Sequence, residues 1–202
     1  MGQDKALLRF EPEGPTLLEM TIASLARIVA RVIVIAPLER GYQSLGLEVV
    51  SDAFPGAGAL GGIATGLLAV GSCDLFVVAC DHPFLSEPLI RHLASLENDY
   101  DVLAPRTQGR SRQGGPFVVQ TLHAIYRPSC LPVLRDVIEK GYESSMDLFR
   151  QVNLRTIDEP ELRRFDPELR SLISVNTPET LAQTRATARK AAEQDGRVDY
   201  TS

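Results

Sequence analysis

The sequence predicts an α/β fold of the Rossmann-like, three-layer type, in which a mostly parallel sheet carries helices on both faces. Short β-branched apolar segments alternate along the chain with helical patterns, which is typical of parallel strands joined by right-handed crossovers. The 202 residues suit one domain that is long enough to bury a sizeable core. A hydrophobic content of 44% and a charged content of 23% are those of an ordinary globular protein.

The predicted strands set the direction of the sheet. Three segments are short, β-branched and nearly all apolar, as strands covered on both faces should be: "RVIVIAP" (31–37), "LEVVSD" (47–52) and "CDLFVVACD" (73–81). A weaker fourth is "YDVLAPR" (100–106). In the second half, 114–126 predicts one or two strands, and a further strand is expected at 171–176.

Helices are predicted between and after these strands. The segments are 14–30, 58–70, 86–96, 128–141 and a final helix that follows Thr177. Pro15 lies near the start of the first, where a missing N–H is harmless, and Ser86 is a candidate N-cap. We expect one domain over residues 1–194 and a disordered tail over 195–202, without internal repeats.

Composition excludes several classes of function. The net charge of −5 gives no electrostatic reason to bind nucleic acid or an anionic membrane. The three cysteines are odd in number and scattered, which argues against a disulfide framework and favours a reducing cytoplasm. The N-terminus has no apolar signal-peptide region, and no apolar run is long enough to span a bilayer.

Oxygen-bearing side chains follow three of the predicted strands. Asp52 ends the second, Asp81 ends the third, and Asn176 follows "SLISV". In an open parallel sheet, ligands bind beyond the carboxyl ends of the strands. This repetition is more informative than any one of the three residues, and it predicts a ligand site at that edge.

Asp81 is the best single candidate. A hard cation such as Mg²⁺ needs one or two carboxylates together with substrate phosphate oxygens. The alternative is that Asp81 only caps the following turn through the backbone. With the other two strand ends we favour a functional role, whereas His82 is interpreted as incidental.

The other candidates each have a structural explanation beside the functional one. Asn176 can ligate a metal through its carbonyl, but "TPE" after it is also a good helix start, so the two interpretations stand about even. Asp52 precedes a glycine-rich stretch in which a ligand can approach the backbone closely, although no Walker A sequence follows. Lys5 can neutralise charge on a leaving group, but by itself it would be interpreted as solvated.

Four motifs in this order, "MGQDKALL", "SDAFPGAGALGGIATGL", "VVACDHPFL" and "SVNTPETL", resemble the molybdenum cofactor guanylyltransferase family. The resemblance covers about residues 1 to 185. It implies the nucleotidyltransferase-like fold and transfer of GMP from GTP to molybdopterin-bound molybdenum cofactor, with release of pyrophosphate and use of Mg²⁺. It also implies possible transient contact with molybdoenzymes or their chaperones.

The resemblance assigns roles to residues of this chain. Lys5 matches the lysine that binds the nucleotide phosphates, and Asp52 matches the acidic residue near the guanosine. Asp81 matches the carboxylate that holds Mg²⁺, and Asn176 matches the last Asn of "NVNTP" at the catalytic rim. Ser174 replaces the first Asn of that motif, so this chain departs from the family there. The resemblance also places His123 in the half of the protein that faces the pterin.

Two alternatives stay open. The chain could use CTP or act on a sugar phosphate, although "GALGGI" and "VNTP" favour the guanylyl branch. It could also be a catalytically inactive module that binds the cofactor or a partner enzyme. If the chain is an enzyme, we expect positioning of the substrates and charge neutralisation to supply most of the rate enhancement, and we expect no covalent enzyme intermediate.

The opening "MGQDKALLRF" begins in the middle of a motif. In the resembled family, a strand and a glycine-rich loop precede this lysine, and the strand lies centrally in the sheet. We therefore expect the first central strand to be missing and the natural protein to be longer by about 20 residues, the size of a strand plus a loop. Protein made from Met1 is expected to be unstable and to bind GTP weakly.

Overall fold

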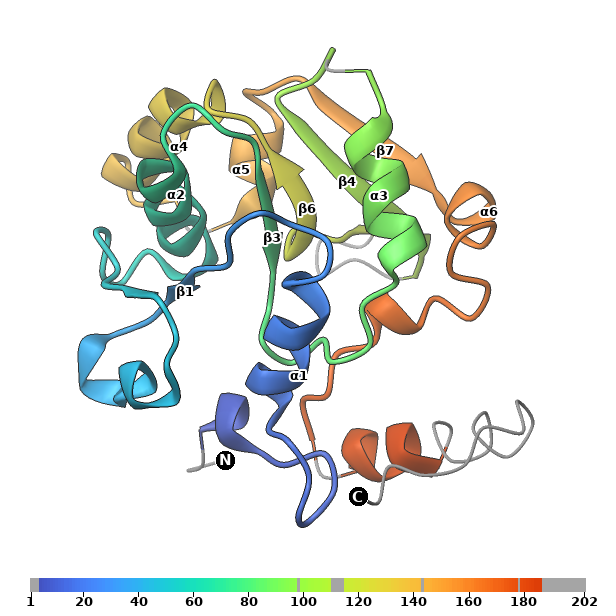
Figure 1. The fold of residues 1–202 in the computed structure, drawn as a ribbon. Helices are drawn as coiled ribbons and strands as arrows, with labels where there is room; N and C mark the ends of the chain where they lie inside the picture. The colour runs from blue at the N-terminus through green and yellow to red at the C-terminus, as the bar shows by residue number, and fades with distance from the viewer. Residues whose placement is uncertain (1–3, 98, 110–114, 143, 178, 187–202) are drawn as a thin grey trace.

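Figure 1 shows the computed structural model of the protein, which describes residues 4–97, 99–109, 115–142, 144–177 and 179–186. The predicted tail at 195–202, and the part of the predicted final helix beyond residue 186, lie outside the described residues. Residues 179–186 are helical, and the amide of Thr180 donates to Thr177 Oγ1 over 3.1 Å, so the predicted cap is confirmed.

The N-terminal third contains two short parallel strands, β1 (Val34–Ile35) and β2 (Val49–Val50). They are preceded by a 3-10 helix, η1 (Lys5–Leu7), and by helix α1 (Leu17–Leu25). Helix α1 is shorter than the predicted 14–30. It begins at a capping box, in which the side chains and amides of Thr16 and Glu19 pair reciprocally, rather than at Pro15.

The remaining strands form a second sheet within the described residues. Its members are β3 (Leu75–Val78), β4 (Val102–Gln108), β5 (Phe117–Val119), β6 (His123–Tyr126) and β7 (Leu154–Asp158). The order is β3-β6-β4-β5, and β7 pairs with the other edge of β4. Strand β4 runs parallel to β7, whereas the pairs β3–β6, β4–β6 and β4–β5 are antiparallel.

The α/β class predicted from the sequence is confirmed, with a mixed sheet. The antiparallel share arises because the chain reverses its direction between β4 and β5, so that β5 and then β6 run antiparallel to β4, and β6 lies between β3 and β4. The predicted strand at 171–176 is wrong. That stretch holds a 3-10 helix, η4 (Arg170–Leu172), and extended chain that joins no strand ladder.

Three longer helices lie where the pattern predicts them: α2 (Gly58–Val70), α3 (Glu87–Ser95) and α4 (Cys130–Glu139). Ser86 caps α3, because its hydroxyl accepts from the amide of Leu89 over 3.3 Å. Two short helices, α5 (Ser145–Phe149) and α6 (Glu159–Leu162), were not predicted. None of the helices in the described part of the chain has the length and apolarity needed to cross a membrane.

The larger sheet is covered on both faces, which gives three layers (Figure 1). On one face α2, α4 and α5 pack over the sheet through buried residues that include Leu60, Ile63, Tyr126, Leu134 and Leu148. On the other face α3 and α6 pack through Leu89, Leu93, Leu103, Ile125 and Leu162. A third, smaller cluster (Ala6, Leu18, Ala36 and Tyr42) holds η1 and α1 against the ends of the first strands.

Candidate active site

The carboxyl end of β3 and the segment before the final helix meet at one edge of the molecule. Strand β3 delivers Asp81 to this edge, and the amide of Val175 donates to the backbone carbonyl of Asp81 over 2.8 Å. This single backbone contact places Ser174 and Asn176, on either side of Val175, beside the Asp81 carboxylate. Asp81 and Asn176, which are far apart in the sequence, therefore come together without a shared strand ladder.

A chain of hydrogen bonds joins three of the four predicted site residues. Lys5 Nζ donates to Asn176 Oδ1 over 2.7 Å. The Asn176 amide group donates to Ser174 Oγ, and the Ser174 hydroxyl donates to Asp81 Oδ2 over 2.9 Å. Ser174, whose role the family resemblance left in doubt, is thus the link between the amide and the carboxylate.

The second oxygen of Asp81 has a different environment. Asp81 Oδ1 is buried and has no hydrogen-bond partner among the described residues. His82 Nε2 lies 3.6 Å from it, while His82 Nδ1 lies 3.1 Å from the carbonyl oxygen of Ser171. Because a carbonyl can only accept, Nδ1 carries a proton in this arrangement. His82, interpreted from the sequence as incidental, therefore lies directly against the candidate carboxylate.

The side-chain oxygen atoms of Asp81 and Asn176 can be compared with the ligands that a hard divalent cation requires. A carboxylate oxygen without a hydrogen-bond partner is a suitable ligand when phosphate oxygens and water complete the shell. Asp81 fits this role through Oδ1. The carbonyl oxygen of Asn176 accepts from the Lys5 ammonium instead, so it could serve as a ligand only after that bond is released. Within the described residues, no group of three or more His, Cys, Asp or Glu side chains could hold a metal alone.

Lys5 is held by its own short helix and by a cluster that the sequence did not reveal. The Asp4 carboxylate caps η1 by accepting from the amide of Ala6 over 3.2 Å. It also accepts from Arg40 Nη1 over 2.7 Å and from the Tyr42 hydroxyl. Burial, with the bond to Asp4, raises the pKa of Tyr42 to about 12. Tyr42 lies 38 positions after Asp4 in the sequence, and Arg40 lies close to Tyr42. No local sequence pattern therefore connects these two residues to Asp4.

Asp52 is not part of this hydrogen-bonded chain. Its Oδ1 accepts from the amide of Phe54 and from the Thr65 hydroxyl, each over 2.9 Å, which ties the end of β2 to helix α2. The turn that follows needs glycine at Gly56, where φ is +90°. Gly61 is also constrained, since a Cβ there would lie 2.7 Å from the carbonyl oxygen of Phe54.

His123 does not lie at a surface where a pterin could reach it. It is fully buried in β6, its ring packs edge-on against Phe76, and neither ring nitrogen has a partner among the described residues. Desolvation, with the nearby His82, lowers the pKa of His123 to about 3. The interpretation of His123 as a pterin-side residue is corrected: it is a neutral core residue, because β6 is an interior strand.

Comparisons with known proteins identify the family of the chain. Residues 1–156 match the family described as the MobA-like NTP transferase domain. A probable molybdenum cofactor guanylyltransferase of Chloroflexus aggregans is 36% identical over 188 residues, which is 92% of this chain and 87% of that protein. One of Pelotomaculum thermopropionicum is 30% identical, over 98% of this chain and 91% of that protein.

Solved structures share the fold. The molybdopterin-guanine dinucleotide biosynthesis protein A of Archaeoglobus fulgidus has a TM-score of 0.75 and 24% identity, over 94% of this chain and 92% of that one. The 2-C-methyl-D-erythritol 4-phosphate cytidylyltransferase of Thermus thermophilus has a TM-score of 0.66 and 19% identity, over 92% and 94%. With the family match and the sequence relatives, the conclusion is direct: this chain belongs to the family of MobA-like NTP transferase domains, which are nucleotidyltransferases.

Proposed function

We propose that this chain transfers GMP from GTP to molybdenum-bound molybdopterin, forming the guanine dinucleotide form of the cofactor and pyrophosphate. The observation that carries the proposal is the hydrogen-bonded chain from Lys5 through Asn176 and Ser174 to Asp81. It places a cation and a carboxylate with an unpartnered oxygen at one sheet edge, which is what a triphosphate site needs. The names of the relatives point to the same substrates.

The chemistry requires positioning more than covalent work. An oxygen of the terminal pterin phosphate forms a bond to the α-phosphorus of GTP, while the bond between that phosphorus and the bridging oxygen of the β-phosphate breaks. Negative charge accumulates on the leaving pyrophosphate. Lys5 is the cation that neutralises it, and Asn176 orients the Lys5 ammonium before the nucleotide binds.

Asp81 is the residue that would hold Mg²⁺, together with phosphate oxygens of the nucleotide. When bound, the ion supplies charge neutralisation and polarises the phosphoryl oxygens. Ser174 keeps Asp81 Oδ2 in place and leaves Oδ1 for the metal. Nucleotide phosphates would draw Lys5 away from Asn176, which would release the Asn176 carbonyl as a second metal ligand.

Asp52 is proposed to select the base. Its Oδ1 is used by the Phe54 amide and the Thr65 hydroxyl, so the carboxylate is fixed in orientation. A fixed carboxylate can accept from the N1–H and amino group of guanine through its second oxygen, Oδ2, and cytosine offers no such pair of donors. The reaction is placed in the cytoplasm, where the free thiols of Cys73, Cys80 and Cys130 would stay reduced.

The test follows a label from the α-phosphate of GTP, or of CTP, onto molybdenum-bound molybdopterin in the presence of Mg²⁺. We expect transfer from GTP and little from CTP. Equal transfer from the two nucleotides would move the chain to a cytidylyl-type activity. Tight GTP binding without any transfer would instead favour the binding-module alternative.

The contribution of Asp52 is measured by competition between GTP and CTP for binding. Replacing Asp52 with Asn keeps the side-chain shape and the bond from Thr65, but removes the charge. The preference for GTP should fall by roughly 10-fold or more, since hydrogen bonds to charged groups are worth ~1.5–3 kcal/mol. An unchanged preference would show that another part of the chain selects the base.

A further inference from the structure

The segment of residues 171–176 joins no strand ladder, so other contacts must fix its position. Asp81 and its neighbour His82 hold this segment at two points. The backbone carbonyl oxygen of Asp81 accepts from the amide of Val175 over 2.8 Å. His82 Nδ1 donates to the carbonyl oxygen of Ser171 over 3.1 Å. The part of the segment that faces the Asp81 carboxylate therefore lies between two fixed points.

The backbone of Ser171 is itself held by a buried carboxylate. The amide and the hydroxyl of Ser171 both donate to Asp166 Oδ2, over 2.9 Å and 2.6 Å. The amide of Arg170 donates to Asp166 Oδ1 over 3.0 Å. Ser171 is fully buried, Asp166 is 6% exposed, and hydrogen bonds to a charged acceptor are stronger than those between neutral groups. The amide, the hydroxyl and the carbonyl of Ser171 thus each have a partner, and the partner of the carbonyl is His82.

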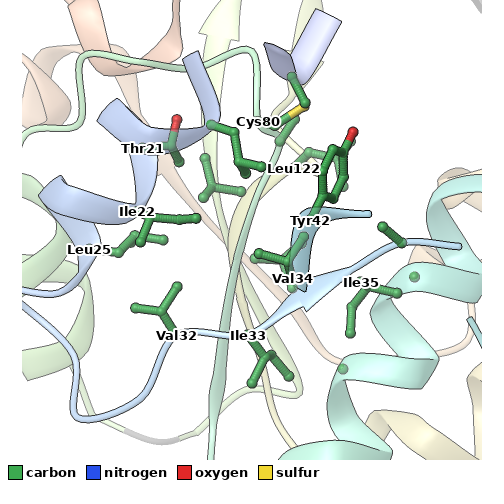
Figure 2. A pocket seen from close by; sticks show the side chains of 18 of the residues that line it. Thr21, Ile22, Leu25, Val32, Ile33, Val34, Ile35, Tyr42, Cys80 and Leu122 are labelled. Atoms are coloured by element: carbon green, nitrogen blue, oxygen red, sulfur yellow. The ribbon is translucent and has the colours of Figure 1, made fainter. Parts of the chain in front are cut away.

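The ring and the backbone of His82 are both fixed by their surroundings. His82 is 7% exposed, and its ring stacks on that of His123 in β6, with 6.2 Å between the ring centroids. The carbonyl oxygen of His82 accepts from the hydroxyl of Thr21, on α1, over 3.3 Å. Figure 2 shows Thr21 and Cys80 at the same end of the apolar cavity between β1 and β3. Contacts from α1 and β6 therefore set the direction in which the His82 ring points.

The other ring nitrogen of His82 faces the candidate metal ligand without bonding to it. His82 Nε2 lies 3.6 Å from Asp81 Oδ1, which is longer than a hydrogen bond. With the proton on Nδ1, a neutral ring has only a lone pair at Nε2 and cannot donate there. His82 therefore holds the segment through Nδ1 and leaves Asp81 Oδ1 without a donor, as a carboxylate that binds a cation requires.

We propose that His82 and Asp166 are positioning residues of the active site. Through the backbone of Ser171 they fix the segment whose side chains connect Asp81 to Lys5 by hydrogen bonds. Both residues act through this segment and not on the reacting atoms. This proposal rests on the proposed function, because the metal and the triphosphate are the ligands that the positioned side chains would bind. The alternative is that the two residues only stabilise the fold.

Four substitutions separate positioning from stability. His82→Leu removes the Nδ1 donor, whereas His82→Asn keeps a donor, because the Asn amide nitrogen is bonded to Cγ as Nδ1 is. Asp166→Ala removes the support from the other side of the segment. Asp101→Ala is the matched control, since Asp101 also accepts from a backbone amide and a serine hydroxyl, those of Asn153 and Ser129. Asp101 directly precedes β4, which runs in the same direction as β3, so it lies at the opposite end of the sheet from the site.

Three measurements are made on each variant. Hydrogen exchange at the Val175 amide reports directly whether the segment is held, and it needs no ligand. The affinity for Mn²⁺ together with inorganic triphosphate reports on the site. This probe offers the metal and the phosphates of any nucleoside triphosphate but carries no base, and Mn²⁺ prefers the same oxygen ligands as Mg²⁺. Thermal unfolding measures the loss of stability.

We expect the Val175 amide to exchange about 10-fold faster in His82→Leu and in Asp166→Ala, as the loss of a hydrogen bond to the segment should allow. The affinity for the probe should fall by about 10-fold in the same two variants. His82→Asn should keep most of both properties. Asp101→Ala should lower the midpoint of unfolding but leave the exchange and the affinity unchanged.

Unchanged exchange and affinity in His82→Leu would overturn the proposal. Equal losses in Asp101→Ala would overturn it too, since the effect would then follow stability alone. An Asn variant as impaired as the Leu variant would contradict a role for the Nδ1 donor. Exchange at Val175 involves no nucleotide, so failure of this proposal is distinguishable from failure of the proposed function, which would be seen as no transfer from GTP by the unsubstituted chain.

Discussion

Strand β1 of the N-terminal third and the first residues of strand β4 in the second sheet are both apolar but have very different surroundings. Residues 32–35 are half-buried, and among the described residues β1 pairs with one strand, β2. Val102, Leu103 and Ala104 of β4 are fully buried, and β4 pairs with strands on both edges. The comparison shows that an apolar, β-branched sequence predicts a strand that can be buried. Whether the strand is buried depends on the elements that pack beside it.

The same contrast separates the two parts of the candidate site. Asp81 follows a strand anchored to the second sheet through β6, and it is fixed by Ser174 and by the Val175 amide. Lys5 lies on a three-residue 3-10 helix that borders an apolar cavity of about 590 Å³ between β1 and β3. The carboxylate is therefore the rigid half of the site, and the lysine depends on the less well covered part of the molecule.

The largest expected effect tests the difference in coverage. Leu103→Ala removes a fully buried side chain between α3 and the sheet, and it should lower the free energy of unfolding by about 3–5 kcal/mol. Ile33→Ala, beside the apolar cavity between β1 and β3, should cost about 1 kcal/mol, because part of that side chain already meets solvent. Urea denaturation of both variants measures the two values. Similar losses for the two substitutions would mean that the N-terminal third is as well covered as the second sheet.

A smaller effect concerns the stability of the protein at low pH, which we expect to depend on His123 in the second sheet. Its pKa is about 3 in the folded protein, mainly through desolvation, against about 6.5 when unfolded. Between these values the unfolded state binds more protons, so stability is lost as the pH falls through this window. The slope is about 1.4 kcal/mol per pH unit, or roughly 2 kcal/mol between pH 6.5 and pH 5.

Replacing His123 with Leu should remove this part of the acid sensitivity, since neither ring nitrogen has a hydrogen-bond partner among the described residues. His92→Gln is the matched control, because His92 is partly exposed and lies 2.8 Å from a Glu161 oxygen. Stability is measured by urea denaturation at pH 7 and pH 5. An unchanged pH dependence in the His123 variant would show that other groups control acid unfolding.

The sequence predicts much of this arrangement for physical reasons that can be named. Helix α2 follows from its apolar pattern, helix α3 from its pattern and the Ser86 cap, and Asp81 from its place after an apolar strand. Strand β7, "LRTID", was missed because it mixes charged and apolar residues without a clear alternation. Its pairing with β4 comes from tertiary packing, not from local preference.

Other parts of the site depend on contacts between distant residues, and no local pattern encodes them. The bond from Lys5 to Asn176 spans 171 positions, and Ser174 gains its role only once that bond and the Asp81 carboxylate are in place. The cluster of Asp4, Arg40 and Tyr42 is of the same kind. Residues 171–176 have a strand-like sequence, but their partners are the Asp81 backbone and the Asp166 carboxylate, so no ladder forms.

The most direct test of the proposed site compares two aspartates at opposite ends of β3. Asp81→Asn removes the charge at the carboxyl end, while Asp74→Asn does the same at the amino end, where Asp74 is exposed and pairs with Arg127 over 3.4 Å. Both variants are made in the 202-residue chain, and GTP-dependent transfer and thermal unfolding are measured. We predict that Asp81→Asn lowers transfer by at least about 100-fold with little change in the unfolding midpoint, and that Asp74→Asn leaves transfer unchanged. Transfer by Asp81→Asn within a few-fold of the unsubstituted chain would contradict the account.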